Sequence, residues 1–295
     1  MLLTVFLIVT FAISLKSLAL QPRNPFRNPS SQYLPYYSQN FYSALQISSK
    51  DENLKYVLKS ILRNYHIFNP GQLDTLTERC PADRRNCYQQ ISLGYERARI
   101  YLMGYLYLVK QQNNYLIKEA YCNKYYGPNE FRGGRGPAPQ TVPDYKVINV
   151  EHTWPQSRFN GRYDKEFQKA DLHHLFPTDS QLNEIRSNNK FGEVISDFKA
   201  LKCGQSRYGV SKASHREVFE PPNPHKGRVA RALFYFSIRY DLPIDTEEEA
   251  FLKKWNAEYP VDQEEITRNE EIYKTQGNRN PFIDYPELAT MISDF

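Results

Sequence analysis

Three side chains in the middle of the sequence, those of Glu151, His152 and Asn183, could together hydrolyse a phosphodiester bond. A histidine has an unperturbed pKa near neutrality, so His152 could act as the general base that activates water. The Glu151 carboxylate and the Asn183 amide oxygen are the kind of ligands that Mg²⁺ takes, usually with several waters beside them. Each residue alone is uninformative, but the combination predicts a metal-assisted hydrolytic site.

A short strand is expected to deliver Glu151 and His152. Residues 145–150 form a run rich in β-branched side chains that ends at this pair, and a second apolar run spans residues 172–176. Adjacent residues on a regular strand point to opposite faces, so both can serve one site only where the strand ends or distorts. Pro155, close behind the pair, favours such an end.

A helix over residues 179–190 is expected to carry the asparagine. Thr178 and Gln181 lie three residues apart and form a capping box at its start. The apolar positions of this helix at i and i+3 would face the core, which leaves Asn183 and Arg186 together on another face. That face could look back at the histidine. The order of elements is strand, connection, strand, helix.

The adjacent histidines His173 and His174 could suggest a zinc site together with His152. Neighbouring residues on a strand alternate between faces, and no third ligand falls at the helical i, i+4 spacing, so zinc is the weaker interpretation. We expect His174 instead to position the strand or to orient a phosphate.

The charge of the chain is unevenly distributed. The formal net charge is +5 over 295 residues, but residues 20–240 carry +13 and residues 241–295 carry −9. A basic body suits a polyanionic partner, nucleic acid above all. Basic secreted proteins without such a partner are an equally weighted alternative. A content of 40% hydrophobic residues suffices for a globular core but lacks the segments of a polytopic membrane protein.

The N-terminus has the pattern of an export signal. Residues 1–19 contain an apolar run too short for a membrane span, followed by small residues before a cleavage point. Residues 20–45, rich in Pro, Asn, Ser and Tyr, are expected to form an extended leader, and residues 46–295 one catalytic domain. Residues 127–144 are rich in Gly and Pro and predict a long surface loop within this domain.

The four cysteines form an even set in a chain expected to leave the reducing compartment, so two disulfides are predicted. Three pairings are possible. Cys80 and Cys87 bracket a short loop and make the easiest pair, which would leave Cys122 with Cys203 across the central segment.

The remaining periodic segments predict helices. Helical spacing of apolar residues is found at residues 54–62, 95–109 and 228–240. Residues 247–255 have an acidic first turn and two lysines near the end, which the helix dipole favours. The fold class predicted by this pattern is α+β, a mostly helical single domain around a small sheet.

Four sequence segments together resemble the bacterial endonuclease I family, a branch of the His-Me finger (ββα-metal) nucleases. They are NVEHTWPQSRF at 149–159, ADLHHLFPTDSQLNEIRSN at 170–188, FEPPNPHKGRVARALFY at 219–235 and RNEEIYKTQGNRNPFIDYP at 268–286. The resemblance covers at least residues 145–287, and motifs spread over this length are highly specific.

The resemblance implies roles for individual residues. His152 would be the general base, Glu151 and Asn183 the metal ligands, and Arg186, one helical turn after Asn183, would meet the scissile phosphate. The ββα-metal motif would span about residues 145–190. The implied metal is Mg²⁺, with Mn²⁺ or Ca²⁺ as substitutes.

Four further basic residues are candidates for the phosphate backbone. Arg158 and Arg162 follow the first strand closely, and Lys226 and Arg228 precede or open a helix. For that helix, a buried structural ion pair, as at Arg231, is the equally weighted alternative.

The predicted function is a secreted, Mg²⁺-dependent endonuclease that cuts DNA, and by extension RNA, with little sequence preference and leaves 5′-phosphate ends. A monomer without stable membrane association is expected. One rival is an extracellular ribonuclease of the same family. The other is a basic secreted nucleic-acid-binding protein without catalysis, against which the full set of Glu151, His152 and Asn183 argues.

Overall fold

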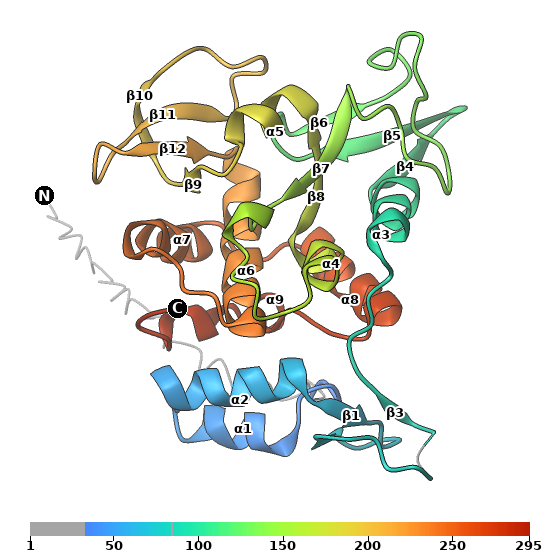
Figure 1. Ribbon diagram of the computed structural model, residues 1–295, viewed down its shortest axis with the longest axis vertical. Helices are drawn as coiled ribbons and strands as arrows, with labels where there is room; N and C mark the ends of the chain where they lie inside the picture. The colour runs from blue at the N-terminus through green and yellow to red at the C-terminus, as the bar shows by residue number, and fades with distance from the viewer. Residues whose placement is uncertain (1–32, 84) are drawn as a thin grey trace, which may run out of the picture. The chain divides into compact units, whose positions relative to one another are not determined.

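The computed structural model describes residues 33–83 and 85–295, and Tyr33–Phe295 form one compact unit. The expected signal peptide (1–19) and the first part of the expected leader lie outside the described residues. In the part that is described, no helix is long and apolar enough to cross a membrane. Helices and short strands alternate along the unit (Figure 1), so the predicted α+β class is confirmed.

The helices account for most of the regular structure. They are α1 Gln39–Gln46, α2 Asp51–Arg63, α3 Tyr95–Tyr101, α4 Lys165–Lys169, α5 Ser180–Arg186, α6 Asn223–Tyr240, α7 Thr246–Glu258, α8 Gln263–Gln276 and α9 Pro281–Asp284. The expected helices at 54–62, 228–240 and 247–255 lie within α2, α6 and α7.

Within residues 33–83 and 85–295, the strands are short and form four small sheets. They are β1 Tyr65–Ile67, β2 Thr75–Thr77, β3 Cys87–Tyr88, β4 Leu108–Gln111, β5 Asn114–Glu119, β6 Lys124–Tyr126, β7 Ile148–His152, β8 Leu175–Asp179, β9 Lys190–Phe191, β10 Val194–Asp197, β11 Arg207–Ser211 and β12 Glu217–Glu220. The sheet orders are β2-β1-β3, β4-β5-β6, β7-β8 and β10-β11-β12-β9.

Helix α6 is the centre of the hydrophobic core. Every residue from His225 to Tyr240 is buried, because α2, α7 and α9 all pack against this helix (Figure 1). A helix buried on all sides must neutralise its charges internally. Arg231 does so through two hydrogen bonds to the Glu265 carboxylate, at 2.8 and 2.6 Å. The structural ion pair considered for Arg231 is therefore present.

The expected leader and one expected helix of the N-terminal third differ from the structure. The leader expected to be extended over 20–45 is helical from Gln39 onward, because Phe41 and Leu45 of α1 are buried in the main core. The helix expected over 95–109 ends earlier. Its α-helical part stops at Tyr101, a π-helical turn follows, and Val109 pairs with Leu116 in the β4-β5 ladder.

The antiparallel strands β7 and β8 and helix α5 form a ββα unit. The register between the two strands is well defined. Thr153 donates its N–H to the His174 carbonyl at 3.0 Å, just beyond the last ladder pair. Hydrogen-bonded and non-bonded pairs alternate in an antiparallel ladder, so Val150 and Pro177 form a non-bonded pair. Pro177, which has no N–H, thus lies where none is needed, and its carbonyl accepts from Ala120 at 2.9 Å.

Helix α5 is capped by Asp179 rather than by the expected Thr178. The Asp179 carboxylate accepts the N–H groups of Gln181 and Leu182 at 3.0 and 3.1 Å. The cap shifts by one residue because strand β8 continues through Thr178 to Asp179. The helix then ends at Arg186 instead of reaching residue 190.

Both preferred disulfides are present, so this pairing is confirmed. Cys80 is bonded to Cys87, and Cys122 to Cys203. The second bond joins the turn after β5 to the loop after β10. At the end of β5, the buried Glu119 carboxylate accepts the Cys122 N–H at 2.7 and 3.0 Å.

Buried histidines predict a loss of stability in acid. Burial lowers the pKa of His173 from 6.5 to about 4 and holds that of His225 well below 6.5. The unfolded chain therefore binds more protons below pH 6.5, and the free energy of unfolding falls as the pH drops from 6.5 towards 4. Each such histidine contributes about 1.4 kcal/mol per pH unit in this window.

Urea unfolding measured at several pH values would check this. His225→Phe should reduce the slope of unfolding free energy against pH by the contribution of one histidine. Phenylalanine is a suitable replacement, because His225 packs between aromatic rings and its Nε2 has no hydrogen-bond partner within the described residues. His215→Phe, at an exposed position, is the control and should keep the wild-type slope. An unchanged slope in His225→Phe would contradict the assignment.

Candidate active site

A pocket of about 500 Å³ opens beside the end of strand β7. Its walls come from three parts of the ββα unit. They are residues 149–152 of β7, residues 155–157 of the following turn, and Asn183, Glu184, Arg186, Ser187 and Asn188 at the end of α5. Glu151, His152, Asn183 and Arg186 therefore border one pocket, although Asn183 and Arg186 are distant from the pair in sequence.

His152 is held in one tautomer by a backbone carbonyl. Its Nε2 lies 3.1 Å from the carbonyl oxygen of Lys169, which can only accept, so Nε2 carries the proton. Nδ1 of the neutral ring is then a proton acceptor. Burial lowers the pKa of His152 to about 4, which keeps the ring neutral near pH 7. The ring is therefore in the form that a general base requires.

Glu151 is a buried carboxylate paired with an arginine. Only 1% of the residue is exposed, and its Oε1 accepts from Nη1 of Arg186 at 2.6 Å. Burial raises the pKa of Glu151 to about 7, and the charge of Arg186 opposes this rise. The carboxylate thus lies on the α5 side of β7, whereas His152 lies against Tyr95 and His174. Both residues line the pocket, which opens where the strand ends.

Arg186 binds the strand end itself. Besides Glu151, it donates to the carbonyls of His152 at 2.9 Å and Thr153 at 2.6 Å, and only 1% of the residue is exposed. Among the described strands, β7 pairs only with β8, so its outer edge needs other hydrogen-bond partners. Arg186 supplies some of them. The expected contact of Arg186 with a scissile phosphate would have to be made from this buried position. There the charge of Arg186 is already paired with Glu151.

Asn183 is anchored to the same edge. Its Nδ2 donates to Oδ1 of Asn149 at 2.6 Å and to the carbonyl of Val150 at 3.2 Å. Both hydrogens of the amide are thereby used, and within residues 33–83 and 85–295 no hydrogen bond is made to its Oδ1. The sequence analysis did not single out Asn149. Its position two residues before Glu151 on the same strand, and therefore on the same face, could have indicated it.

The donor set fits a hard cation with few protein ligands. The pocket offers the carboxylate of Glu151 and the amide oxygen of Asn183, and Mg²⁺ commonly keeps waters at its other positions. Among the described residues, no group of three or more His, Cys, Asp or Glu could hold a metal. His173 and His174 are each bonded through Nε2 to a backbone carbonyl, of Asn278 and Gln168 respectively.

Three of the expected substrate contacts are not brought to the pocket. His174 is fully buried. Lys226 donates to Glu220 at 2.6 Å, and Arg228 to Asp262 at 2.7 Å and Glu264 at 3.1 Å. Both cations are less than 10% exposed, so an external phosphate could reach them only by displacing carboxylates.

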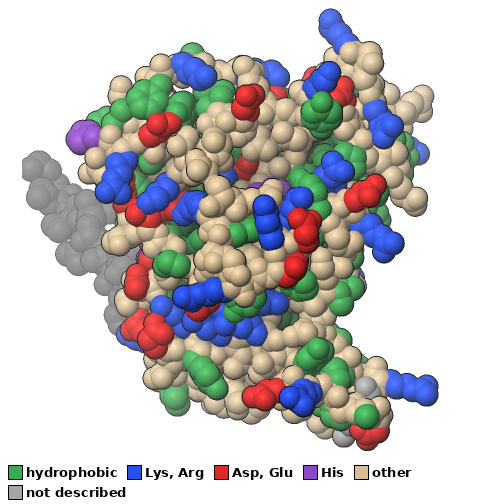
Figure 2. All heavy atoms as spheres, viewed as in Figure 1, with side chains coloured by type: hydrophobic (Ala, Val, Ile, Leu, Met, Phe, Trp, Pro, Cys, Tyr) green, Lys and Arg blue, Asp and Glu red, His purple; other side chains and the backbone are tan. Residues whose placement is uncertain are grey.

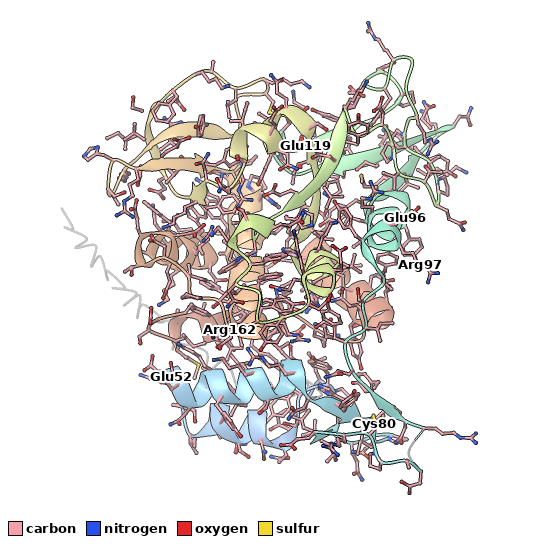
Figure 3. The ribbon with its side chains drawn as sticks, viewed as in Figure 1. Glu52, Cys80, Glu96, Arg97, Glu119 and Arg162 are labelled. Atoms are coloured by element: carbon pink, nitrogen blue, oxygen red, sulfur yellow. A yellow bond between two sulfur atoms is a disulfide. The ribbon has the colours of Figure 1, made fainter. Side chains whose placement is uncertain are left out.

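Arg158 and Arg162 do not line the pocket at the end of β7 either. Arg158 forms an ion pair with the buried Glu248 at 2.6 Å. Arg162 is exposed and pairs with Asp241 at 3.2 Å. It lines a second pocket of about 250 Å³ together with Lys55 and Lys59 of α2. Figure 2 shows Lys and Arg side chains gathered in the hollow above α2, and Figure 3 labels Arg162 there.

Comparison with known proteins identifies relatives for most of this unit. The family model described as Endonuclease I matches residues 85–287. The extracellular ribonuclease of Bacillus subtilis (strain 168) is 35% identical over 164 residues, which cover 49% of this chain and 53% of that protein. The extracellular deoxyribonuclease of Aeromonas hydrophila is 31% identical over 166 residues, covering 55% and 71%. The chain spans about half the length of the Bacillus ribonucleases that it matches.

Proposed function

Because the chain belongs to the endonuclease I family, we propose that it is a secreted, Mg²⁺-dependent endonuclease that hydrolyses phosphodiester bonds in DNA and RNA and leaves 5′-phosphate ends. The observation that carries the proposal is the tautomer of His152 beside Glu151 and Asn183 in one pocket. Relatives named extracellular or periplasmic nucleases support the exported location.

The reaction begins with proton transfer to His152. Its Nδ1 takes a proton from a water molecule, whose oxygen attacks phosphorus in line with the departing 3′ oxygen. The Lys169 carbonyl holds the other ring nitrogen and stabilises the imidazolium that forms. The buried ring is neutral before this step, which is the protonation state that a base needs.

Glu151 and Asn183 would hold the cation through one carboxylate and one amide oxygen. When bound, Mg²⁺ neutralises charge that develops on the phosphate oxygens and on the leaving group. The Arg186 guanidinium lies 2.6 Å from the carboxylate and opposes the rise in the Glu151 pKa to about 7 that burial causes, so it favours the ionised form that a cation binds. The chain thus supplies a carboxyl ligand next to the base.

Digestion of matched plasmid DNA and single-stranded RNA, each with and without EDTA, tests the proposal. Cleavage of both substrates that stops with EDTA and returns with Mg²⁺ is expected, with ends that accept a label only after removal of the 5′ phosphate. Cleavage of RNA alone would favour a ribonuclease, the function in the names of the Bacillus relatives. Salt-sensitive binding without cleavage would favour a binding protein.

Loss of the amide ligand should weaken the dependence on metal without removing the base. Asn183→Ala is expected to raise the Mg²⁺ concentration for half-maximal hydrolysis at least roughly 10-fold, since even residues that only support a metal ligand have effects of this size. Asn188→Ala changes an amide at the rim of the same pocket and is the matched control. Equal Mg²⁺ profiles for the two variants would argue against Asn183 as a ligand.

A further inference from the structure

Asn149 and the Val150 carbonyl together hold the NH₂ end of the Asn183 amide against strand β7. An asparagine amide can present either an oxygen or an NH₂ group, and only the oxygen can ligate a cation. The side chain that sets this orientation is therefore as necessary to a metal site as the ligand itself. We infer that Asn149 is a positioning residue for Asn183, an inference that rests on the proposed metal-dependent function.

The contacts around Asn183 leave one consistent arrangement. The carbonyl of Val150 can only accept, so the nitrogen of the Asn183 amide must face it, at 3.2 Å. Oδ1 of Asn149 accepts the second hydrogen at the shorter distance of 2.6 Å. With both hydrogens bound on the side of β7, Oδ1 of Asn183 is turned to the pocket that Glu151 also lines.

Asn149 is well placed to act on this ligand alone. It shares a face of β7 with Glu151, because the two residues are two positions apart on a strand. It also lines the pocket. Without Asn149, the Asn183 amide would keep only the longer bond to Val150, and rotation about its last torsion would bring NH₂ towards the cation.

Titration of the metal-free protein with MgCl₂ or MnCl₂ by calorimetry tests the inference without measuring activity. Asn149→Leu keeps the size of the side chain but removes the acceptor, and we expect metal to bind roughly 10-fold more weakly, the lower end of the effect for groups that orient metal ligands. Asn149→Asp keeps an acceptor oxygen and should bind at least as tightly as the wild type. Asn188→Leu is the matched control and should bind as the wild type does.

A second measurement separates this inference from the proposed function. In the metal-free protein, exchange of the Asn183 side-chain NH₂ protons with solvent, followed by NMR, should be faster in Asn149→Leu than in the wild type. Wild-type protein that binds neither metal would refute the metal proposal, while the exchange rates would still decide the positioning role. Asn149→Leu with wild-type affinity and exchange would overturn the inference, as would equal losses in Asn149→Asp. Thermal unfolding in EDTA checks that each variant is folded, and Asn149→Ala replaces any that is not.

Discussion

Replacing His152 with alanine is expected to lower the rate of hydrolysis by roughly 10²- to 10⁴-fold, the range for loss of a general base. Nucleic-acid binding should be largely retained, because the ring is buried and held by the Lys169 carbonyl rather than placed on an open binding surface. Single-turnover rates and fluorescence anisotropy in EDTA would measure the two quantities separately.

The matched control is His215→Ala, which removes an exposed histidine. It should leave both rate and affinity as in the wild type. If His152→Ala turned over at the wild-type rate, the assignment of the base would be lost. If affinity fell as far as the rate, His152 would be a binding residue instead.

Replacing Arg186 with methionine is expected to cost about 3–5 kcal/mol of unfolding free energy, the range for breaking a buried ion pair on one side. The Glu151 carboxylate would lose its buried partner, and the carbonyls of His152 and Thr153 would lose their donor. Urea unfolding at pH 8 would measure the loss. Hydrolysis should fail as well, since the strand end that forms the pocket depends on these bonds.

Two further variants test whether charge pairing is the cause. Arg162→Met removes an exposed cation with a single partner, so a change of at most about 1 kcal/mol is expected. Glu151→Gln added to Arg186→Met should recover part of the stability, because it removes the uncompensated charge. No recovery would mean that the lost backbone hydrogen bonds dominate.

Local signals sufficed to predict the strand and the helix that border the candidate pocket, whereas the roles of the residues on them were implied by the family resemblance. An apolar strand ends at His152 and a polar helix start precedes Asn183, and both residues line one pocket. The central helix was likewise predictable, since helical spacing of apolar residues is a local property. The disulfides followed from the easiest pair among four cysteines.

The partners of basic residues could not be predicted in the same way. Lys226 and Arg228 have the spacing of phosphate-binding residues at a helix start, but tertiary packing brings Glu220, Asp262 and Glu264 to them. These acidic partners come from other elements, so local periodicity does not reveal them. The sheets other than β7-β8 were missed for a related reason, because strands of two to six residues with one exposed face leave little pattern.

Arg186 shows a further limit. Sequence spacing placed it on one face with Asn183, but its partners are backbone carbonyls, which every residue has and no sequence pattern marks. The His152 carbonyl is available because it lies on the edge of β7 that does not face β8, and Thr153 lies just beyond the end of the strand.

Pro177 disfavours a shifted register between β7 and β8, and it thereby helps to keep the residues of the candidate site aligned. A shift of β8 by one residue along β7 would carry the proline into a pair that requires an N–H, and the ladder would lose a bond that no other group replaces. The same shift relative to β7 would displace Asn183 from the acceptors that hold it, since α5 follows β8 directly. Pro177 takes part in no proton transfer. It nevertheless makes the register that forms the candidate site the favoured one when β7 and β8 pair.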